Sequence, residues 1–203
     1  MIDFYTAPTP NGHKVSCTLE ALNMDYEVHV VNLMENEQKK PDFLKISPNG
    51  RIPAIIDTSN NLTIFESGAI MIYLADKANN LISTDPQKRA KVLEWLMFQM
   101  GGPGPIFGQV HHFLRAAPEP VPYAIERYGK ETQRLYAVLD KQLSISQFLT
   151  DEYSIADMAT YPWVARHEWH KIDLNSYPNV KRWFDELGQR EAVQKGMAVP
   201  FLN

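Results

Sequence analysis

Three short stretches in the first part of the chain combine residue types that could bind an anionic ligand and activate a thiol. In the first, Thr9-Pro10-Asn11-Gly12, the Thr9 hydroxyl and the Asn11 amide can each donate a hydrogen bond to sulfur. Such donors stabilise the charged form, so they would lower the pKa of a bound thiol and increase the fraction of thiolate. Because the single cysteine, Cys17, lies outside this stretch, the attacking sulfur would have to come from the ligand.

The other two stretches offer groups for the remainder of such a ligand. Pro53 lacks an N–H, and an X-Pro bond can be cis where a chain turns into a strand, which would leave the Ile52 N–H and C=O available. Ser67 precedes the apolar helical pattern of Ile70, Met71 and Leu74. Its hydroxyl and the free N–H groups of a helix N-terminus would form a small anion-binding site. An anionic, peptide-like ligand would fit this combination.

Each of these residues also has a purely structural interpretation. Ser67 could serve only as a helix N-cap, and Glu66 only as an acid favoured by the helix dipole. Thr9 and Asn11 could simply build a turn, as such residues often do. The spacing leaves both interpretations open.

The hydrophobic pattern predicts the elements that must position these residues. Ile2 to Tyr5 is expected to form a strand, Val15 to Leu22 to lie on an amphipathic helix after a loop over 7–12, and Glu27 to Val31 to form a second strand. The remaining elements of this half are one helical turn over 41–44, strands over 52–57 and 62–65, and a helix beginning at Glu66-Ser67-Gly68. A βαβ unit followed by a ββα unit gives a mixed sheet with helices on both faces, which is the thioredoxin-like arrangement.

After a linker over 79–86 the pattern is entirely helical. Helices are expected over 88–100 and 123–143, from the capping box Ser154 to Asp157, and from Pro178, while the cluster Gly101 to Pro105 must break or kink the chain. We therefore predict an α/β thioredoxin-like domain over residues 1–79 and an all-α domain over residues 87–203.

Composition limits the classes of function. The 203 residues are 44% hydrophobic and 22% charged, with a net charge of -4, so the basic excess typical of nucleic-acid binding is missing. The uncharged run from Trp95 to Leu114 contains glycines, prolines and histidines that argue against a membrane span. With one cysteine and no signal-like N-terminus, we expect a cytoplasmic protein that does not bind nucleic acid or membrane.

The predicted pair of domains, together with three motifs, resembles the cytosolic glutathione transferases over essentially the whole chain. The motifs are Ile52-Pro53-Ala54, Phe65-Glu66-Ser67-Gly68-Ala69-Ile70 and Tyr153-Ser154-Ile155-Ala156-Asp157. Residues 7–14, 108–113 and 122–128 are similar to the bacterial Nu class. Members of that class resemble the folded domain of the yeast prion-forming nitrogen regulator and reduce disulfides with glutathione.

The resemblance implies how glutathione would be held. Ile52 would hydrogen-bond the glutathione cysteine through its backbone beside a cis Pro53, and Glu66 and Ser67 would hold the γ-glutamyl ammonium and carboxylate. Gln38 would reach the glycyl end.

The resemblance also gives Thr9 and Asn11 the catalytic role, with Asn11 contacting glutathione, and has Arg127, from the same or a second subunit, pair with a ligand carboxylate. Tyr5 is an alternative thiol donor, because other glutathione transferase classes use an N-terminal tyrosine. Arg127 could instead be an i,i+4 partner of Glu131.

The function expected from this resemblance is a glutathione-dependent disulfide-bond reductase. The bound glutathione thiolate would attack a small disulfide, and a second glutathione would resolve the mixed disulfide. Two alternatives stay open: a transferase or peroxidase acting on electrophiles or hydroperoxides, and a non-catalytic regulatory module that binds glutathione as a structural ligand. A homodimer, glutathione as co-substrate and no metal are further implications.

The remaining chemistry-bearing residues are expected to be structural. Cys17 should be a buried, inert thiol. His167 and His170 have a spacing that could ligate a metal, but no Cys or further His accompanies them, so surface positions are expected.

Overall fold

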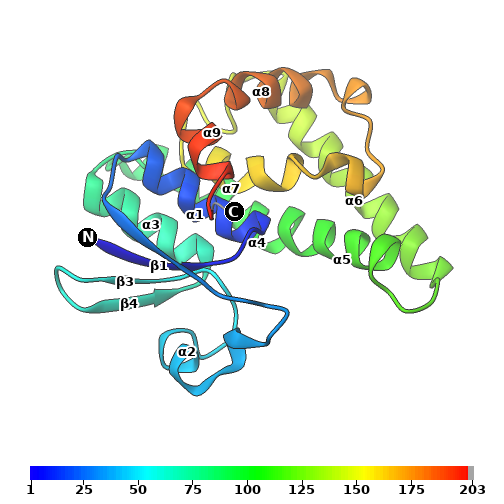
Figure 1. The fold of residues 1–203 in the computed structure, drawn as a ribbon. Coiled ribbons are helices and arrows are strands. Elements are labelled where there is room, and N and C mark those ends of the chain that lie inside the picture. The colour runs from blue at the N-terminus through cyan, green and yellow to red at the C-terminus, as the bar shows by residue number, and fades with distance from the viewer. Residues whose placement is uncertain (201–203) are drawn as a thin grey trace. The chain divides into compact units, whose positions relative to one another are not determined.

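The strands of the protein form one mixed four-stranded sheet in the order β2-β1-β3-β4, in a computed structural model that describes residues 1–200 (Figure 1). The strands are β1 (Ile2–Thr6), β2 (Tyr26–Val30), β3 (Ala54–Asp57) and β4 (Leu62–Phe65). β1 is parallel to β2 and antiparallel to β3, which is antiparallel to β4. The thioredoxin-like arrangement predicted from the sequence is confirmed.

Helices cover both faces of this sheet (Figure 1). α1 (Pro10–Ala21) and α3 (Ser67–Ala78) pack together on the face that carries Ile2 and Phe4, which are both buried. On the other face, α2 (Pro41–Ile46), which follows the 3₁₀ turn Glu37–Lys39, brings Phe43 against Tyr5 with ring centroids 6.3 Å apart.

A helix from the end of the chain belongs to the same unit. In α9 (Glu191–Met197) the Gly196 carbonyl accepts a hydrogen bond of 2.6 Å from the Ser16 hydroxyl of α1. A Cβ at Gly196 would collide with the backbone of Cys17, so only glycine allows α9 to approach α1 this closely.

The second unit is helical throughout its described residues. Its α-helices are α4 (Pro86–Gly101), α5 (Pro103–Arg115), α6 (Pro122–Leu143), α7 (Ile155–Val164) and α8 (Pro178–Gly188), with 3₁₀ turns at His167–His170 and Leu174–Ser176. As expected, the Gly/Pro cluster separates two helices, and Pro178 occupies the first helical position of α8. Each helix predicted in this half of the chain is present, with its predicted ends shifted by at most two residues, whereas α5 was not predicted.

The chain divides between Ile82 and Ser83 and again between Gln189 and Arg190. The first division falls within the predicted linker over 79–86. The second differs from the expected boundaries, which placed residues 190–203 in the helical domain, because α9 packs on α1. Among the described residues, no helix is long and apolar enough to cross a membrane.

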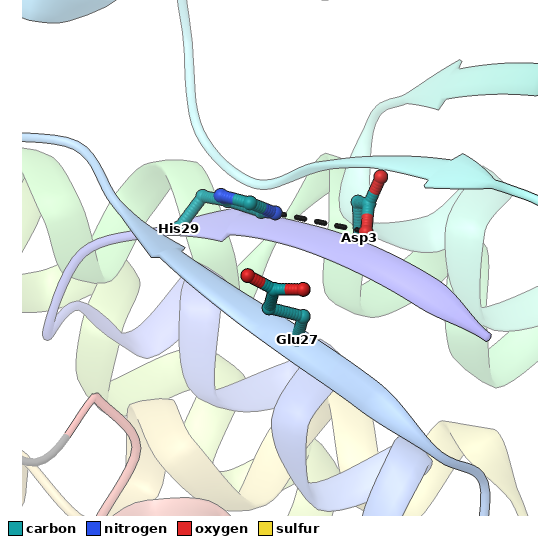
Figure 2. A group of neighbouring side chains, drawn as sticks. All are labelled: Asp3, Glu27 and His29. Carbon is teal, nitrogen blue, oxygen red and sulfur yellow. Dashed lines mark ion pairs between the residues drawn. The ribbon is translucent and has the colours of Figure 1, made fainter.

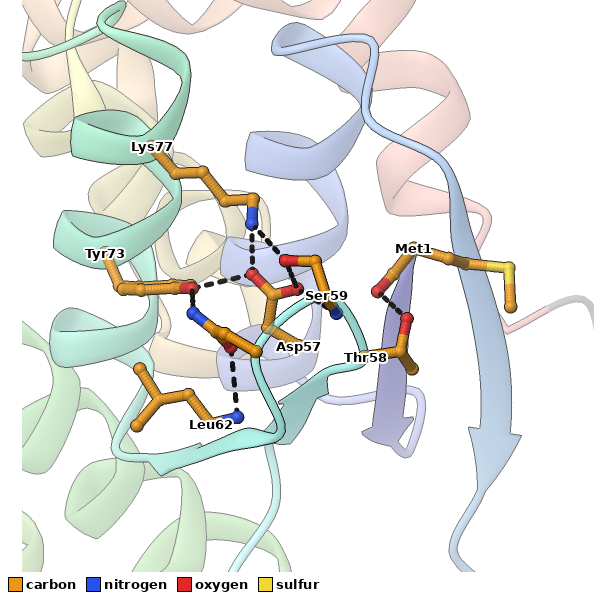
Figure 3. Close-up of polar contacts among 8 residues, drawn as sticks. Met1, Asp57, Thr58, Ser59, Leu62, Tyr73 and Lys77 are labelled. Atoms are coloured by element: carbon orange, nitrogen blue, oxygen red, sulfur yellow. Dashed lines mark hydrogen bonds and ion pairs between the residues drawn. The ribbon is translucent and has the colours of Figure 1, made fainter.

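A buried carboxylate ties the β3–β4 hairpin to α3 (Figure 3). Asp57, at the end of β3, accepts hydrogen bonds from the Tyr73 hydroxyl at 2.6 Å, the Ser59 hydroxyl at 2.7 Å and the Lys77 ammonium. Burial by itself raises the pKa of this carboxyl, but the bonds from Lys77, Tyr73 and Ser59 outweigh it and hold the pKa well below its usual range. The charge of Asp57 is therefore part of what stabilises the first unit.

A second buried carboxylate organises α7. Asp157 completes the predicted capping box with Ser154, whose backbone N–H lies 3.0 Å from Oδ2, while Oδ1 accepts from the Leu149 N–H at 3.0 Å and from the Trp183 indole at 2.9 Å. Burial raises the pKa of Asp157 to about 6, although these hydrogen bonds act against the shift. One side chain thus joins α7 to α8 and to the loop before α7.

The Asp57→Asn variant tests the first carboxylate. An aspartate with a lowered pKa stabilises the fold above its ordinary pKa of about 3.9, and this contribution disappears as the pH falls toward the folded-state value. In urea titrations the variant should lose about 3 kcal/mol of unfolding free energy at neutral pH. The deficit should shrink below about pH 4. The exposed Asp25→Asn should show a small, constant difference, and a deficit for Asp57→Asn that is constant with pH would contradict this account.

The Asp157→Asn variant tests the second carboxylate. An amide keeps one acceptor oxygen but turns an NH₂ group toward N–H donors, which leaves buried groups unsatisfied at about 1–3 kcal/mol each. We expect a loss of at least about 2 kcal/mol in unfolding free energy, followed by Trp183 fluorescence in urea. Asp151→Asn, at an exposed neighbouring position, is the matched control, and equal stability of the two variants would refute the role of Asp157.

Candidate active site

Three strand ends meet at one edge of the sheet. Tyr5 near the end of β1 pairs with Ala54 at the start of β3, and Ala54 pairs with Phe65 at the end of β4. The segments that continue from these positions are the Thr9 turn, the Ile52-Pro53 bend and the start of α3. The antiparallel placement of β3 therefore brings together residues that are far apart in the sequence.

Thr9 and Asn11 lie at the N-terminus of α1. The helix begins at Pro10, so the prediction of a loop through Gly12 was wrong at its end; the reason is that Thr9 caps the helix and proline suits the first helical position. The Thr9 hydroxyl oxygen accepts a hydrogen bond from the Gly12 N–H at 3.2 Å. A Cβ at Gly12 would collide with Thr6 Oγ1 and the Ala7 carbonyl oxygen, so glycine lets this turn press against the end of β1.

The Thr9 hydroxyl oxygen therefore has the structural role of a helix cap. The oxygen is an acceptor in the cap, whereas a hydroxyl also carries one hydrogen that it can donate. The cap fixes the position from which that hydrogen would be directed. Asn11 is half-buried in the first helical turn.

The Ile52-Pro53 bond is cis, as the sequence suggested. Within residues 1–200, the backbone N–H and C=O of Ile52 form no hydrogen bond with the rest of the chain. Its side chain packs against the apolar cluster of Val31, Phe43 and Ala54. The Ile52 backbone N–H and C=O are therefore available for hydrogen bonding, while the Ile52 side chain anchors the bend in the apolar cluster.

The start of α3 differs from the prediction in one respect. The N-cap is Glu66 and not Ser67, because Glu66 has φ 71° and ψ 115° and Ser67 is already the first helical residue. A positive φ is costly for a side chain of this size, and such strain is concentrated at functional positions. Ser67 is buried, and the first N–H groups of α3 have no partner within the helix.

Gln38 lies in the 3₁₀ turn after β2. β2 is parallel to β1, so this turn follows the same edge of the sheet. The Gln38 Oε1 atom is shielded from solvent and has no hydrogen-bond partner among the described residues. It is an acceptor suited to an N–H group of a ligand.

A charged residue that the sequence analysis missed lies behind this edge. Lys14 of α1 is 1% exposed, and burial lowers the pKa of its ammonium to about 7, although the Glu66 charge acts in the opposite direction. The sequence did contain a signal for this burial. Lys14 precedes Thr18 by four residues, so it lies on the same face of the helix as Thr18, which is the face that is buried.

Tyr5, the alternative thiol donor, points to the face of the sheet that α2 covers. Its ring stacks on His29 at 4.6 Å and meets Phe43 edge-on. Burial, followed by the charges of Asp3 and Glu27, raises the pKa of its hydroxyl. Thr9 instead lies at the N-terminus of α1, where the helix dipole favours an anion.

Arg127 lies in the second unit, on α6. It lines an open hollow of about 550 Å³ together with Ile106, Tyr123, Glu126, Tyr128, Lys130, Glu131 and Arg134. The Glu131 carboxylate accepts two hydrogen bonds from Arg134, at 2.7 and 2.8 Å, and the charge of its i,i+4 neighbour Arg127 also helps to lower its pKa.

The other singled-out residues are structural, with one correction. Cys17 is buried, and burial raises the pKa of its thiol to about 12, so it is inert as predicted. His170 is not on the surface: it is 3% exposed, and its ring lies against that of Phe107, tilted by 39° with the centroids 4.9 Å apart. The short 3₁₀ turn after α7 turns this histidine inward, which the i,i+3 spacing with His167 did not predict.

Comparisons with known proteins agree with this architecture. The chain matches the family models "Glutathione S-transferase, N-terminal domain" over residues 2–76 and "Glutathione S-transferase, C-terminal domain" over residues 106–191. It is 50% identical to the Escherichia coli disulfide-bond oxidoreductase YfcG, over 97% of this chain and 94% of that protein. It is 36% identical to the E. coli disulfide-bond oxidoreductase YghU, over all of this chain and 76% of that protein.

Two solved structures are similar over almost the whole chain. A glutathione transferase homologue from Lodderomyces elongisporus, with two GSH per subunit, is 42% identical with a TM-score of 0.94 and coverage of 98% of both chains. A glutathione transferase from Pseudomonas putida, with one glutathione disulfide per subunit, is 41% identical with a TM-score of 0.93, covering 98% of this chain and 91% of that one. The protein therefore belongs to the glutathione S-transferase family.

Proposed function

We propose that this protein is a glutathione-dependent disulfide-bond reductase. The observation that carries the proposal is the 50% identity with the E. coli disulfide-bond oxidoreductase YfcG over nearly the full length of both chains. The relatives with two GSH or one glutathione disulfide per subunit add support, because these are the reactant and product of such a reaction.

The site can bind glutathione along the common edge of the sheet. The Ile52 backbone offers an N–H and a C=O to the cysteinyl residue, in the manner of an added strand. The N-terminus of α3 with Ser67 offers donors to the γ-glutamyl carboxylate, and the Glu66 carboxylate offers an acceptor for the ammonium. Gln38 Oε1 is an acceptor for the glycyl N–H.

The chemistry then needs no cysteine from the protein. Thr9 and Asn11, at the positive end of α1, donate hydrogen bonds to the glutathione sulfur and favour its thiolate form. This thiolate attacks one sulfur of the substrate disulfide, a new S–S bond forms, and the other substrate sulfur leaves as a thiolate that takes up a proton. A second glutathione thiolate attacks the mixed disulfide, which yields glutathione disulfide and the second reduced product.

Arg127 is proposed to complete the site from the second subunit of a homodimer. It is exposed on α6, and it lies beside both acidic and basic neighbours in an open hollow, where a ligand carboxylate could replace water. We place the activity in the cytoplasm, where thiols are kept reduced.

A second candidate is conjugation of electrophiles by the same thiolate. The name of the matching family favours it. It shares every binding step with the reductase and differs only in the group that the sulfur attacks, so the two are separated by the second substrate that supports turnover.

Thr9→Ala tests the placement of the chemistry. The loss of one hydrogen bond to a charged sulfur, about 1.5–3 kcal/mol, should lower the turnover of hydroxyethyl disulfide about 10- to 100-fold. The assay couples glutathione disulfide formation to glutathione reductase and NADPH. The acidic limb of the pH–rate profile should move to higher pH, because the thiol pKa rises.

Thr9→Ser is the matched control, since it keeps both the donor and the helix cap. It should retain most of the activity. Wild-type rates in Thr9→Ala would exclude the proposed role of Thr9. If wild type showed no disulfide reduction but conjugated an electrophile, the transferase would replace the reductase.

Mixing two inactive variants tests whether Arg127 acts across subunits. Thr9→Ala and Arg127→Ala subunits exchanged in equal amounts should recover roughly a quarter of wild-type activity, because half of the dimers then contain one intact site. If Arg127 acts within its own subunit, the mixture should be no more active than the separate variants. Arg134→Ala, from the same helix and hollow, should stay close to wild type.

A further inference from the structure

Two carboxylates and one imidazole converge on the sheet face opposite α1 and α3, away from the helix N-termini of the candidate active site (Figure 2). Asp3 of β1 is directly opposite Glu27 of β2, and His29 follows Glu27 by two residues on the same face of its strand. One ligand atom of each of the three side chains lies within 4.8 Å of the other two.

This arrangement is unfavourable as an unoccupied surface. Two carboxylates directly opposite each other on neighbouring strands repel. The His29 Nε2 atom is shielded from solvent and has no hydrogen-bond partner among residues 1–200. Asp3 Oδ1 is 3.6 Å away, which is too far for a hydrogen bond and close enough for a shared ligand or an ion pair.

Two of the three groups, His29 and Asp3, are also held in place. The His29 ring stacks on Tyr5 at 4.6 Å with an interplanar angle of 18°, so its Nε2 atom is directed along the sheet toward Asp3. Asp3 lies on a strand that is paired on both sides. Glu27 is exposed and can adjust its side chain. A rigid imidazole and carboxylate with one adjustable carboxylate suit a metal ion better than three mobile side chains.

We propose that Asp3, Glu27 and His29 form a binding site for a divalent transition-metal ion, with Zn²⁺ as the probe that best matches the donors. One imidazole nitrogen with carboxylate oxygens is a donor set of such ions, whereas Mg²⁺ and Ca²⁺ prefer oxygen alone. Bond lengths of about 2.0–2.2 Å require the ligand atoms to approach one another, which the exposed Glu27 permits.

The site would remain open to water. The side chains of His29 and Asp3 are 35% and 23% exposed, so solvent can reach the ion and complete its coordination. Because β2 is the outer strand of the sheet, an ion held by Asp3 and by two residues of β2 would fasten this strand to β1. This inference does not depend on the proposed reductase activity.

Zinc titration of chelator-treated protein by calorimetry tests the proposal, with variants Glu27→Gln and His29→Gln. Glu27 is exposed and glutamine has nearly the same shape as glutamate, so the Glu27→Gln variant should fold normally. We expect one Zn²⁺ per chain for wild type and about tenfold or greater loss of affinity in each variant. In ¹⁵N spectra the His29 Nε2 resonance should shift on addition of zinc.

The matched controls are His112→Gln and Glu35→Gln, which change an exposed histidine and an exposed acid elsewhere. Both should bind zinc as wild type does. Absence of binding in wild type would show that His29 and Asp3 form an ion pair only. Binding that persists in Glu27→Gln and His29→Gln, or that is lost in a control, would place the ion elsewhere. Each of these results would overturn the proposal.

Discussion

The pairing of β3 between β1 and β4 is the constraint on which the candidate active site depends. β3 runs antiparallel to both neighbours, so its start meets the ends of the other two. The segments with Thr9 and Asn11, with Ile52, and with Glu66 and Ser67 continue from this row of residues, whereas Gln38 follows β2. Asp57 stabilises the opposite end of β3 through Tyr73 and Lys77, so the hairpin is anchored by a buried charge on the side away from the ligand.

The N-termini of α1 and α3 supply the hydrogen-bond donors at this edge of the sheet, and close packing holds both in position. Gly12 lets α1 begin against the end of β1, and Thr9 caps it with an oxygen that still carries a hydrogen to donate. At α3 the strained Glu66 takes the N-cap position and places Ser67 in the first turn. Helix N-termini favour anions, so thiolate and carboxylate groups of one ligand can be held without a metal or a protein thiol.

The same sheet carries a second group of polar side chains, which differs from the first in charge and in hydrogen-bonding groups. At the active edge the polar groups are mainly hydrogen-bond donors from backbone and hydroxyl groups. On the face with Asp3, Glu27 and His29, two carboxylates and one imidazole lie close together, and these side chains are the donor set of the proposed metal site. Side chains alternate along β1, so Asp3 lies on the face opposite the buried Phe4.

Local pattern was enough to predict most of the architecture. The spacing of apolar residues identified the strands and most of the helices, though not α5 or α9, and Ser154 with Asp157 identified the capping box, because these signals act over a few residues. The candidate residues of the edge also came from short motifs: Thr9 and Asn11 without a cysteine, Pro53 before a strand, and Ser67 at the start of a helix.

Long-range contacts decided the rest. The sequence could not predict that α9 packs on α1, since this depends on the absence of a Cβ at Gly196 beside Cys17. The burial of Lys14 and His170, the stacking of Tyr5 on His29 and the convergence of Asp3, Glu27 and His29 likewise arise from neighbours distant in the chain. Local pattern determines which elements form, because their hydrogen bonds close over a few residues. Only packing decides which side chains lose water and which charges meet.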